Sequence, residues 1–326
     1  MKRRAFLLLS GATAFLPPDL QAQPSAIPVI GFLNSGSPEA FSAYVAALRE
    51  GLRETGYVEG RNVVIDFRWA RGRYEMLPAM ARELVEQRVA LIIATGGDPS
   101  AKAATSATAS IPIVFGAGDD VMKSGLVESL NRPGRNATGI SLLAAELEAK
   151  RLELLSELVP QAKKIAVLVN PDLAYAERQA RAVQDAARLR GQQVLVARAR
   201  SEDEFDGVFG QFSAESVDAL IVASDPFFNS RRDKIIALAN RARLPAIYEW
   251  REFCVAGGLI SYGASLTAAY RQFGIYAGRI LSGTRAGDLP VLQPTQFELV
   301  VNGTTARELG IVLPPTIVAR ADEVIE

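Results

Sequence analysis

The feature that most constrains this chain is an internal repeat. The apolar run Ala90–Ala94 is followed by Thr-Gly-Gly-Asp-Pro, and the apolar run Ala219–Ala223 is followed by Ser-Asp-Pro. An apolar run that breaks into Asp-Pro is typical of a buried strand that leads into a helix. Three further pairs of segments match in the same order, each offset by about 130 residues: Pro28–Gly36 with Lys164–Asp172, Gly60–Arg71 with Gly191–Ser201, and Ile111–Gly116 with Leu244–Glu249. The ordered set predicts a duplicated α/β domain.

The hydrophobic periodicity predicts alternating strands and helices in both copies. In the first copy we expect strands over Val29–Leu33, Val63–Trp69, Ala90–Ala94 and Ile113–Phe115, and helices over Pro38–Thr55, Tyr74–Arg88, Pro99–Ser106 and Val121–Leu130. In the second copy we expect helices near Leu173–Leu189, Ser201–Phe212 and Ser230–Arg243. The remaining predicted elements are a crossing strand over Ala137–Leu143, strands over Leu259–Tyr262 and Phe297–Val301, and helices over Leu266–Leu281 and Thr304–Leu309. The predicted fold class is α/β, with two similar Rossmann-like lobes and a parallel central sheet in each.

The first 22 residues resemble an export signal. A basic Lys2-Arg3-Arg4 segment precedes the apolar run Phe6–Leu16, which is too short to span a bilayer. Cleavage is expected after Ala22, so we predict a periplasmic protein with residues 1–22 removed; an uncleaved anchor is the alternative. Because Arg3-Arg4-Ala-Phe-Leu resembles the twin-arginine signal, that export route is open.

Composition excludes several classes of function. Because the chain has no histidine, Ser-His-Asp catalysis and histidine-ligated zinc are excluded. No G-x-G-x-x-G follows a strand and no P-loop is present, so we expect no cofactor and no metal. Without residues 1–22 the chain holds 33 basic and 35 acidic residues, a balance that argues against a nucleic-acid partner. The single cysteine, Cys254, allows no intramolecular disulfide, and we interpret it as a small apolar side chain near a strand end.

Several motifs together resemble the ABC-transporter substrate-binding protein family with a type I periplasmic-binding fold. They are IGFLNSGSPEA, NRPGRNATG, KRLELL-ELVP, SDPFFNSRRD, IYEWREF, FELVVN and TARELG, and they cover nearly the whole chain. The resemblance implies two lobes joined by crossing segments, a ligand held between them, and delivery to an ABC permease. It also implies amino acid ligands, including aromatic ones. With Gly263 and Pro290–Pro294 as breaks, the predicted lobes are residues 23–141 with 263–291, and 142–262 with 292–326.

Polar and aromatic residues at the predicted strand ends form the candidate ligand site, because open α/β sheets bind ligands there. The first lobe supplies Asn34, Ser35, Thr95, Gly96, Gly97, Asp98 and Gly116, and the second supplies Asn170, Tyr175, Ser224, Asp225, Phe227, Glu249, Trp250 and Tyr262. Small residues before a helix expose N–H groups that suit a carboxylate, and an acidic side chain suits an ammonium. Each aromatic side chain has core packing as its alternative role, and Asp225 has helix capping.

These observations predict a solute-binding component of an ABC importer that captures a small polar or amphipathic ligand, an amino acid or a related carboxylate. Two other classes stay open: a ligand sensor for a membrane receptor, and a periplasmic enzyme that uses Asp98, Asp119, Asp225 or Glu249. The expected partners are the small-molecule ligand and a permease in the inner membrane. We expect no catalytic residues and a monomer.

Overall fold

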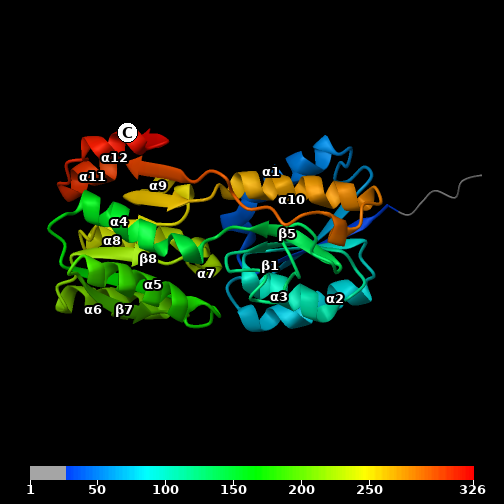
Figure 1. Cartoon of the computed structure of the whole chain (residues 1–326), viewed down its shortest axis with the longest axis horizontal. Helices are drawn as coiled ribbons and strands as arrows, with labels where there is room; N and C mark the ends of the chain where they lie inside the picture. Colours follow the sequence, from blue (N-terminus) through cyan, green and yellow to red (C-terminus); the bar gives the residue numbers. More distant parts are fainter. Residues whose placement is uncertain (1–26) are drawn as a thin grey trace, which may run out of the picture.

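The computed structural model describes residues 27–326, which form two α/β lobes side by side (Figure 1). The predicted export signal lies outside these residues. Among them, no helix combines the length and the apolarity that a bilayer crossing requires. Each lobe contains one sheet with helices on both faces, which is the doubly wound arrangement.

In the described residues, the first sheet contains five parallel strands in the order β2-β1-β3-β4-β5. The strands are β1 (Val29–Asn34), β2 (Val64–Trp69), β3 (Leu91–Thr95), β4 (Ile113–Ala117) and β5 (Ala137–Ser141). The helical segments between them are α1 (Pro38–Glu54), η1 (Tyr74–Met76), α2 (Leu77–Glu86) and α3 (Asp98–Ala107). Helix α1 begins at Pro38 because Ser37, in extended conformation, caps it by accepting the Ala40 N–H.

The second sheet has the order β12-β11-β10-β9-β8-β6-β7, counted over the same residues. Its strands are β6 (Lys164–Val169), β7 (Gln193–Arg198), β8 (Ala219–Val222), β9 (Ala246–Tyr248), β10 (Ile260–Gly263), β11 (Glu298–Asn302) and β12 (Glu323–Ile325). The order β7-β6-β8-β9-β10 repeats that of the first sheet, which confirms the duplicated fold. Only β10 and β11, of the described pairs, run antiparallel.

The second half of the chain contributes most of the helices. They are η2 (Ala145–Leu147), α4 (Glu148–Leu158), α5 (Ala176–Leu189), η3 (Glu202–Glu204), α6 (Phe205–Ala214), α7 (Pro226–Ser230), α8 (Arg232–Arg241), α9 (Arg251–Val255), α10 (Leu266–Leu281), η4 (Ala286–Asp288), α11 (Gly303–Leu309) and α12 (Pro315–Arg320). Helix α10 lies beside α1, on the first sheet, although it follows β10 of the second (Figure 1). The two helices approach closely because neither Gly51 nor Gly274 has a side chain: a Cβ on Gly51 would lie 1.8 Å from the Arg271 carbonyl oxygen.

The chain passes between the lobes after β5, after β10 and before β11. The segment before β11 runs along the edge of β5, where the Ser141 N–H donates to the Leu292 carbonyl at 2.9 Å and the Leu292 N–H donates to the Gly139 carbonyl at 3.0 Å. The run Ala137–Leu143 was expected to cross between halves, whereas the structure pairs its strand with β4 in the first sheet. The residue boundaries of the lobes stay a prediction.

Two predicted helices differ from the structure. The expected helix over Val121–Leu130 is wrong, because this segment forms turns. The Asp120 side chain accepts the N–H groups of Met122 and Lys123, and Gly125 has φ +74°, which a right-handed helix does not allow. The expected helix over Ser230–Arg243 corresponds to α8, which begins two residues later at Arg232, and the short α7 before it was not predicted. Cys254 is fully buried in α9, not near a strand end, and its thiol lies 3.4 Å from the Val300 carbonyl oxygen.

Candidate functional site

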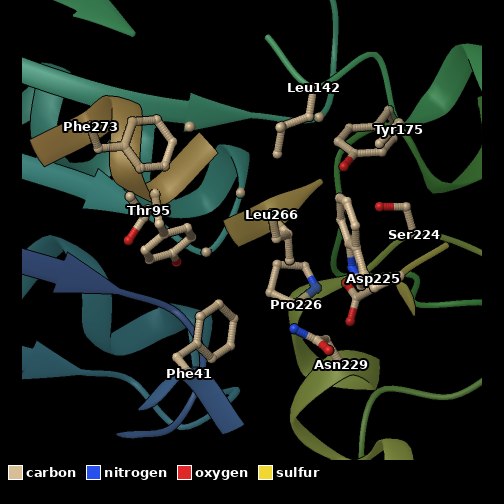
Figure 2. Close-up of a pocket in the computed structure, with 17 residues that line it drawn as sticks. Phe41, Thr95, Leu142, Tyr175, Ser224, Asp225, Pro226, Asn229, Leu266 and Phe273 are labelled. Carbon is tan, nitrogen blue, oxygen red and sulfur yellow. The ribbon is translucent and has the colours of Figure 1, made fainter. Parts of the chain in front are cut away.

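A cavity, here called the inner cavity, lies between the ends of the strands of the two sheets (Figure 2). It is lined by residues of the first sheet and its helices (Phe41, Thr95, Gly96, Gly97, Gly116, Gly118), by Leu142, Ala144, Leu266, Tyr270 and Phe273, and by Tyr175, Ser224, Asp225, Pro226, Asn229 and Trp250 of the second lobe. Its volume is about 40 Å³, which is room for a few water molecules, since one water needs about 10–15 Å³. Anything larger enters only if the lobes separate.

Five aromatic side chains form part of the wall. Phe41 comes from α1, Tyr270 and Phe273 come from α10, and Tyr175 and Trp250 come from the second lobe. The Phe41 and Tyr270 centroids lie 6.2 Å apart and the Tyr270 and Phe273 centroids 5.3 Å apart, so these three rings form one continuous surface. Such a surface favours an apolar, flat ligand group.

The first lobe presents backbone to the cavity. Gly96 and Gly97 have φ +76° and +84° and form the turn that starts α3. Asn34 fixes this turn from behind: its amide donates to the Thr95 hydroxyl and to the Tyr270 hydroxyl, each at 3.0 Å. The Ser35 hydroxyl donates to the Gly96 carbonyl. Asn34 and Ser35 are fully buried and therefore position the turn that lines the cavity.

Asp225 is the only charged residue among the described residues that line the inner cavity. One carboxylate oxygen caps α7 by accepting the Phe228 N–H at 3.0 Å. The other accepts the Tyr74 hydroxyl at 2.9 Å and the Asn170 amide at 3.1 Å. All three donors are neutral, and no lysine or arginine of residues 27–326 forms an ion pair with this carboxylate.

Burial dominates the electrostatics of Asp225. The residue is 3% exposed, and desolvation raises its pKa from 3.8 to about 6, although its three hydrogen bonds favour the ionised form. At neutral pH the site therefore holds a desolvated negative charge without a cation. This arrangement is costly for the protein alone and is relieved by a cationic partner.

A second buried charge network lies behind the cavity. The Arg151 guanidinium is 2.9 Å from the Glu148 carboxylate and 3.5 Å from the Glu249 carboxylate, and all three side chains are buried. Glu148 also accepts the Gln179 amide at 3.2 Å and the Ser224 N–H at 3.3 Å, whereas neither Glu249 oxygen has a hydrogen bond in the described residues. Burial raises the pKa of Glu249 to about 8, although the nearby Arg151 guanidinium acts in the opposite direction.

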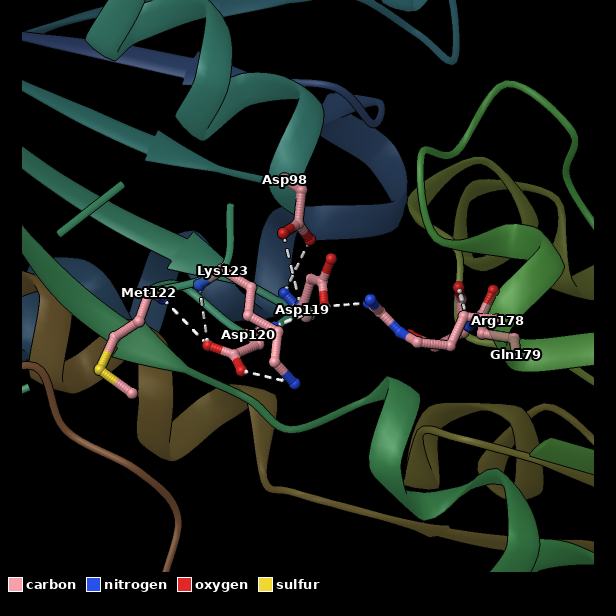
Figure 3. Close-up of polar contacts among 9 residues, drawn as sticks. Asp98, Asp119, Asp120, Met122, Lys123, Arg178 and Gln179 are labelled. Atoms are coloured by element: carbon pink, nitrogen blue, oxygen red, sulfur yellow. Dashed lines mark hydrogen bonds and ion pairs between the residues drawn. The ribbon is translucent and has the colours of Figure 1, made fainter. Parts of the chain in front are cut away.

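Several contacts join the lobes around the cavity. The Gly72 backbone, with φ +84°, lies against the Phe227 ring. A Cβ at this position would be 2.7 Å from a ring carbon, so only glycine fits. A Cβ on Gly97 would be 3.0 Å from Pro226, and one on Gly118 would be 2.5 Å from the Tyr175 hydroxyl. At the rim, Arg178 pairs with Asp119 (Figure 3). The two lobes therefore meet over the cavity.

A larger space, here called the outer chamber, opens to solvent next to the inner cavity and measures about 670 Å³. Tyr74, Asp98, Lys102 and Asp119 of the first lobe line it together with Asp172 and Tyr175 of the second. Asp98 accepts the Gly118 N–H at 2.8 Å, and burial raises its pKa to about 6. Tyr175 lines both spaces.

Comparison with known proteins assigns the family. The model of the ABC transporter substrate binding protein family matches residues 27–325. The chain belongs to this family. A tyrosine-binding protein from Clostridioides difficile strain R20291 is 30% identical over 263 residues, which are 80% of this chain and 75% of that protein.

Two similar solved structures differ in whether a ligand is bound. An ABC domain from Streptococcus pneumonia in complex with L-Trp is 26% identical, with TM-score 0.80 over 91% of this chain and 100% of the other. The ligand-free, open structure of a substrate binding protein with adhesive properties from Clostridium difficile is also 26% identical, but its TM-score is 0.64 over 92% and 99%. This structure is therefore more similar to the L-Trp complex than to the open structure, and its two lobes contact each other around the inner cavity.

For this family member, the structure brings eight of the predicted site residues to the inner cavity. They are Thr95, Gly96, Gly97, Gly116, Tyr175, Ser224, Asp225 and Trp250. Asn34, Ser35 and Asn170 lie directly behind them, and Asp98 faces the outer chamber. The other three lie elsewhere: Phe227 packs against Phe205 and Phe228, Glu249 faces Arg151, and Tyr262 packs against Phe297.

Sequence reasoning missed the rings of Phe41, Tyr270 and Phe273 on α1 and α10. It also missed Leu142, Ala144 and Leu266, which lie where the chain passes between the lobes, and Tyr74. Phe41 on α1, and Tyr270 and Phe273 on α10, each belong to the apolar helical spacing of their own helix, which is the same pattern that core residues give. Tyr74 lies 151 residues from Asp225 in the chain, so no local pattern connects the two. The one available signal was the position of Tyr74 shortly after a predicted strand end.

Proposed function

We propose that this substrate-binding protein captures an aromatic L-α-amino acid between its lobes and presents it to an ABC permease. The observation that carries the proposal is Asp225, a buried carboxylate at the cavity whose only partners in the described residues are neutral donors. A carboxylate has about four acceptor positions, so one remains for a ligand ammonium. That ammonium would neutralise a charge that now costs the protein free energy.

The other two parts of an aromatic amino acid find matching groups. The turn Gly96–Gly97 lies at the N-terminus of α3, where backbone N–H groups and the helix dipole favour a carboxylate. The ring surface of Phe41, Tyr270 and Phe273 suits an aromatic side chain. The tyrosine-binding relative and the L-Trp complex support the same ligand class.

The proposed mechanism is binding without catalysis. The lobes open to admit the ligand and close when groups of both lobes contact it, because a ligand shifts such an equilibrium only by its preference for one state. We further propose that residues 1–22 direct export to the periplasm and that the protein acts there as a monomer.

The test is identification of the ligand, followed by titration. The protein is purified without refolding and its bound small molecules are identified by mass spectrometry; calorimetric titration of ligand-stripped protein with L-tryptophan, L-tyrosine, L-leucine and 3-indolepropionate follows. We expect at least one aromatic amino acid to bind more tightly than L-leucine, and 3-indolepropionate, which lacks the ammonium, to bind far more weakly. Equal binding of the amine-free analogue would contradict the role of Asp225.

A further inference from the structure

We propose that Arg151 is a positioning residue for ligand capture, because its buried guanidinium joins two of the segments that cross between the lobes to the turn that carries Asp225. Arg151 lies on α4 and does not line the inner cavity. It therefore acts on a ligand only through other residues. The inference rests on the proposed function, since it takes Asp225 as a ligand-binding group.

The Arg151 guanidinium holds both of these crossing segments. Its Nε donates to the Tyr262 carbonyl oxygen at 2.9 Å, near the end of β10, and its Nη1 donates to the Ala144 carbonyl oxygen at 3.4 Å, shortly after β5. Ala144 itself lines the inner cavity. Arg151 is the only buried arginine or lysine among residues 27–326. Because a guanidinium carries five donors in a fixed plane, it can hold two carbonyls and a carboxylate at the same time.

Glu148 extends the connection from Arg151 to the ligand-binding turn. The two side chains form an ion pair of 2.9 Å, and the same carboxylate oxygen accepts the Ser224 N–H at 3.3 Å. The Ser224 carbonyl is also held, because it accepts the Gln179 amide at 3.0 Å. Ser224 is thus fixed at its N–H and at its carbonyl, and it directly precedes Asp225. The orientation of Asp225 toward the cavity therefore depends on this network.

The end of β9 belongs to the same network. The Arg151 Nη2 lies 3.5 Å from the Glu249 carboxylate, and Glu249 directly precedes Trp250, which lines the inner cavity. The Glu249 backbone also lies against the second crossing segment, because a Cβ on Gly263 would be 2.3 Å from the Glu249 carbonyl oxygen. Two crossing segments, one ligand-binding turn and one strand end therefore meet around a single side chain.

A buried cluster of this kind contributes more to geometry than to stability. Desolvation of three ionisable side chains costs free energy that their mutual attraction only partly returns, and apolar replacements of whole clusters are often neutral or stabilising. An apolar side chain could fill the volume of Arg151, but it could not hold its partners in fixed directions. We therefore expect the network to affect ligand affinity without a matching effect on stability.

The experiment replaces the whole network in a triple variant that combines Glu148→Gln, Arg151→Met and Glu249→Gln. Glu148→Gln keeps an oxygen for the Ser224 N–H, so the connection through Arg151 is the one that is removed. The unfolding temperature should stay within about 5 °C of wild type. The affinity for L-tryptophan or L-tyrosine, whichever wild type binds more tightly, should fall about 10-fold in calorimetric titration, as for residues that act on a site without contacting the ligand.

Two single variants complete the design. Arg151→Lys keeps the charge but lacks the planar fork, so it should also weaken binding about 10-fold, and it replaces the triple variant if that variant does not fold. Arg68→Met is the matched control. Arg68 also contacts two carboxylates, those of Asp66 and Glu83, but it lies on β2 and does not line the inner cavity. This control should leave the affinity unchanged.

Hydrogen exchange of the ligand-free proteins, measured by mass spectrometry, gives a second readout that needs no ligand. The crossing segments lose their donor in the triple variant, so peptides over residues 142–147 and 262–266 should exchange faster than in wild type. The same should hold for Arg151→Lys. The peptide over β6 serves as internal reference and should not change, because no residue of this strand contacts Arg151 through a hydrogen bond or an ion pair.

The possible failures are distinguishable. Wild-type affinity in both the triple variant and Arg151→Lys would overturn this inference and leave the proposed function intact. Weaker binding without faster exchange of the crossing segments would overturn it as well. A wild-type protein that binds neither L-tryptophan nor L-tyrosine would refute the proposed function, and the hydrogen exchange would then decide by itself whether Arg151 holds the crossing segments.

Discussion

Asp225→Asn should weaken ligand binding and stabilise the ligand-free protein, a combination that a purely structural residue would not produce. Asparagine keeps the side-chain oxygen that caps α7 but removes the charge. Raising the pKa of a carboxyl from 3.8 to about 6 corresponds to about 3 kcal/mol of unfavourable free energy for the ionised form at neutral pH. The substitution removes this cost.

Part of that gain is offset by the neighbours. The amide nitrogen of an asparagine would face the Asn170 amide, which now donates to Asp225 at 3.1 Å, and one lost hydrogen bond costs about 1 kcal/mol. The Tyr74 hydroxyl, which now donates to Asp225, can rotate and accept a hydrogen bond from this amide nitrogen instead. We therefore expect a net stabilisation of about 1–2 kcal/mol at pH 7.5, seen as a Tm higher by a few degrees.

Binding should change in the opposite direction. Loss of a desolvated charge contact costs about 2–5 kcal/mol, or about 30-fold to several-thousand-fold in Kd. In wild-type protein the affinity should also fall about 10-fold for each pH unit below 6, because Asp225 must lose its proton to bind an ammonium. The Asp225→Asn variant should lack this dependence.

The assay is calorimetric titration at pH 5 to 8 beside thermal unfolding of ligand-free protein. Asp233→Asn serves as control, because the Asp233 side chain is 87% exposed and lies 3.9 Å from Arg232. An Asp225→Asn variant with unchanged affinity and lower stability would reduce Asp225 to a helix cap and refute the reasoning.

The same network and contacts support three further predictions. Glu249→Gln should gain stability relative to wild type by about 1.4 kcal/mol per pH unit as the pH rises from 4.5 to about 8, measured in denaturant titrations. The raised pKa of the Glu249 carboxyl stabilises the wild-type fold at low pH, and this stabilisation is lost as the pH rises to about 8. Parallel stability profiles of variant and wild type would contradict the prediction. Gly72→Ala should speed ligand release in stopped-flow fluorescence because its Cβ meets Phe227, whereas Gly56→Ala, with φ +88° and open space, should not. Arg178→Ala should weaken ligand affinity by at most a few-fold at low salt and should leave it unchanged at about 0.5 M salt, because its ion pair with Asp119 is half-exposed. The control Arg188→Ala should leave affinity unchanged at both salt concentrations, because its ion pair lies within α5.

That the two lobes share one strand order could be predicted, because it follows from the repeat. Two copies with the same sequence of strands and helices fold into two sheets with the same order, and parallel strands bring their polar ends to one edge. This is why Thr95, Ser224 and Asp225 line the cavity as expected. Phe41 and Phe273 were not predicted as cavity residues because helical periodicity does not distinguish a ring that faces the core from one that faces a cavity.

The two Asp-Pro turns show how a repeat can mislead about roles while predicting the fold. The first copy has two more residues than the second between its apolar run and its aspartate. These additional residues bring the Gly96–Gly97 turn to the inner cavity, and Asp98 faces the outer chamber, where it accepts the Gly118 N–H. In the second copy the shorter turn places Asp225 itself at the cavity. One lobe therefore offers backbone N–H groups at a helix N-terminus and the other offers a carboxylate, and this asymmetry suits a ligand with a negative and a positive end.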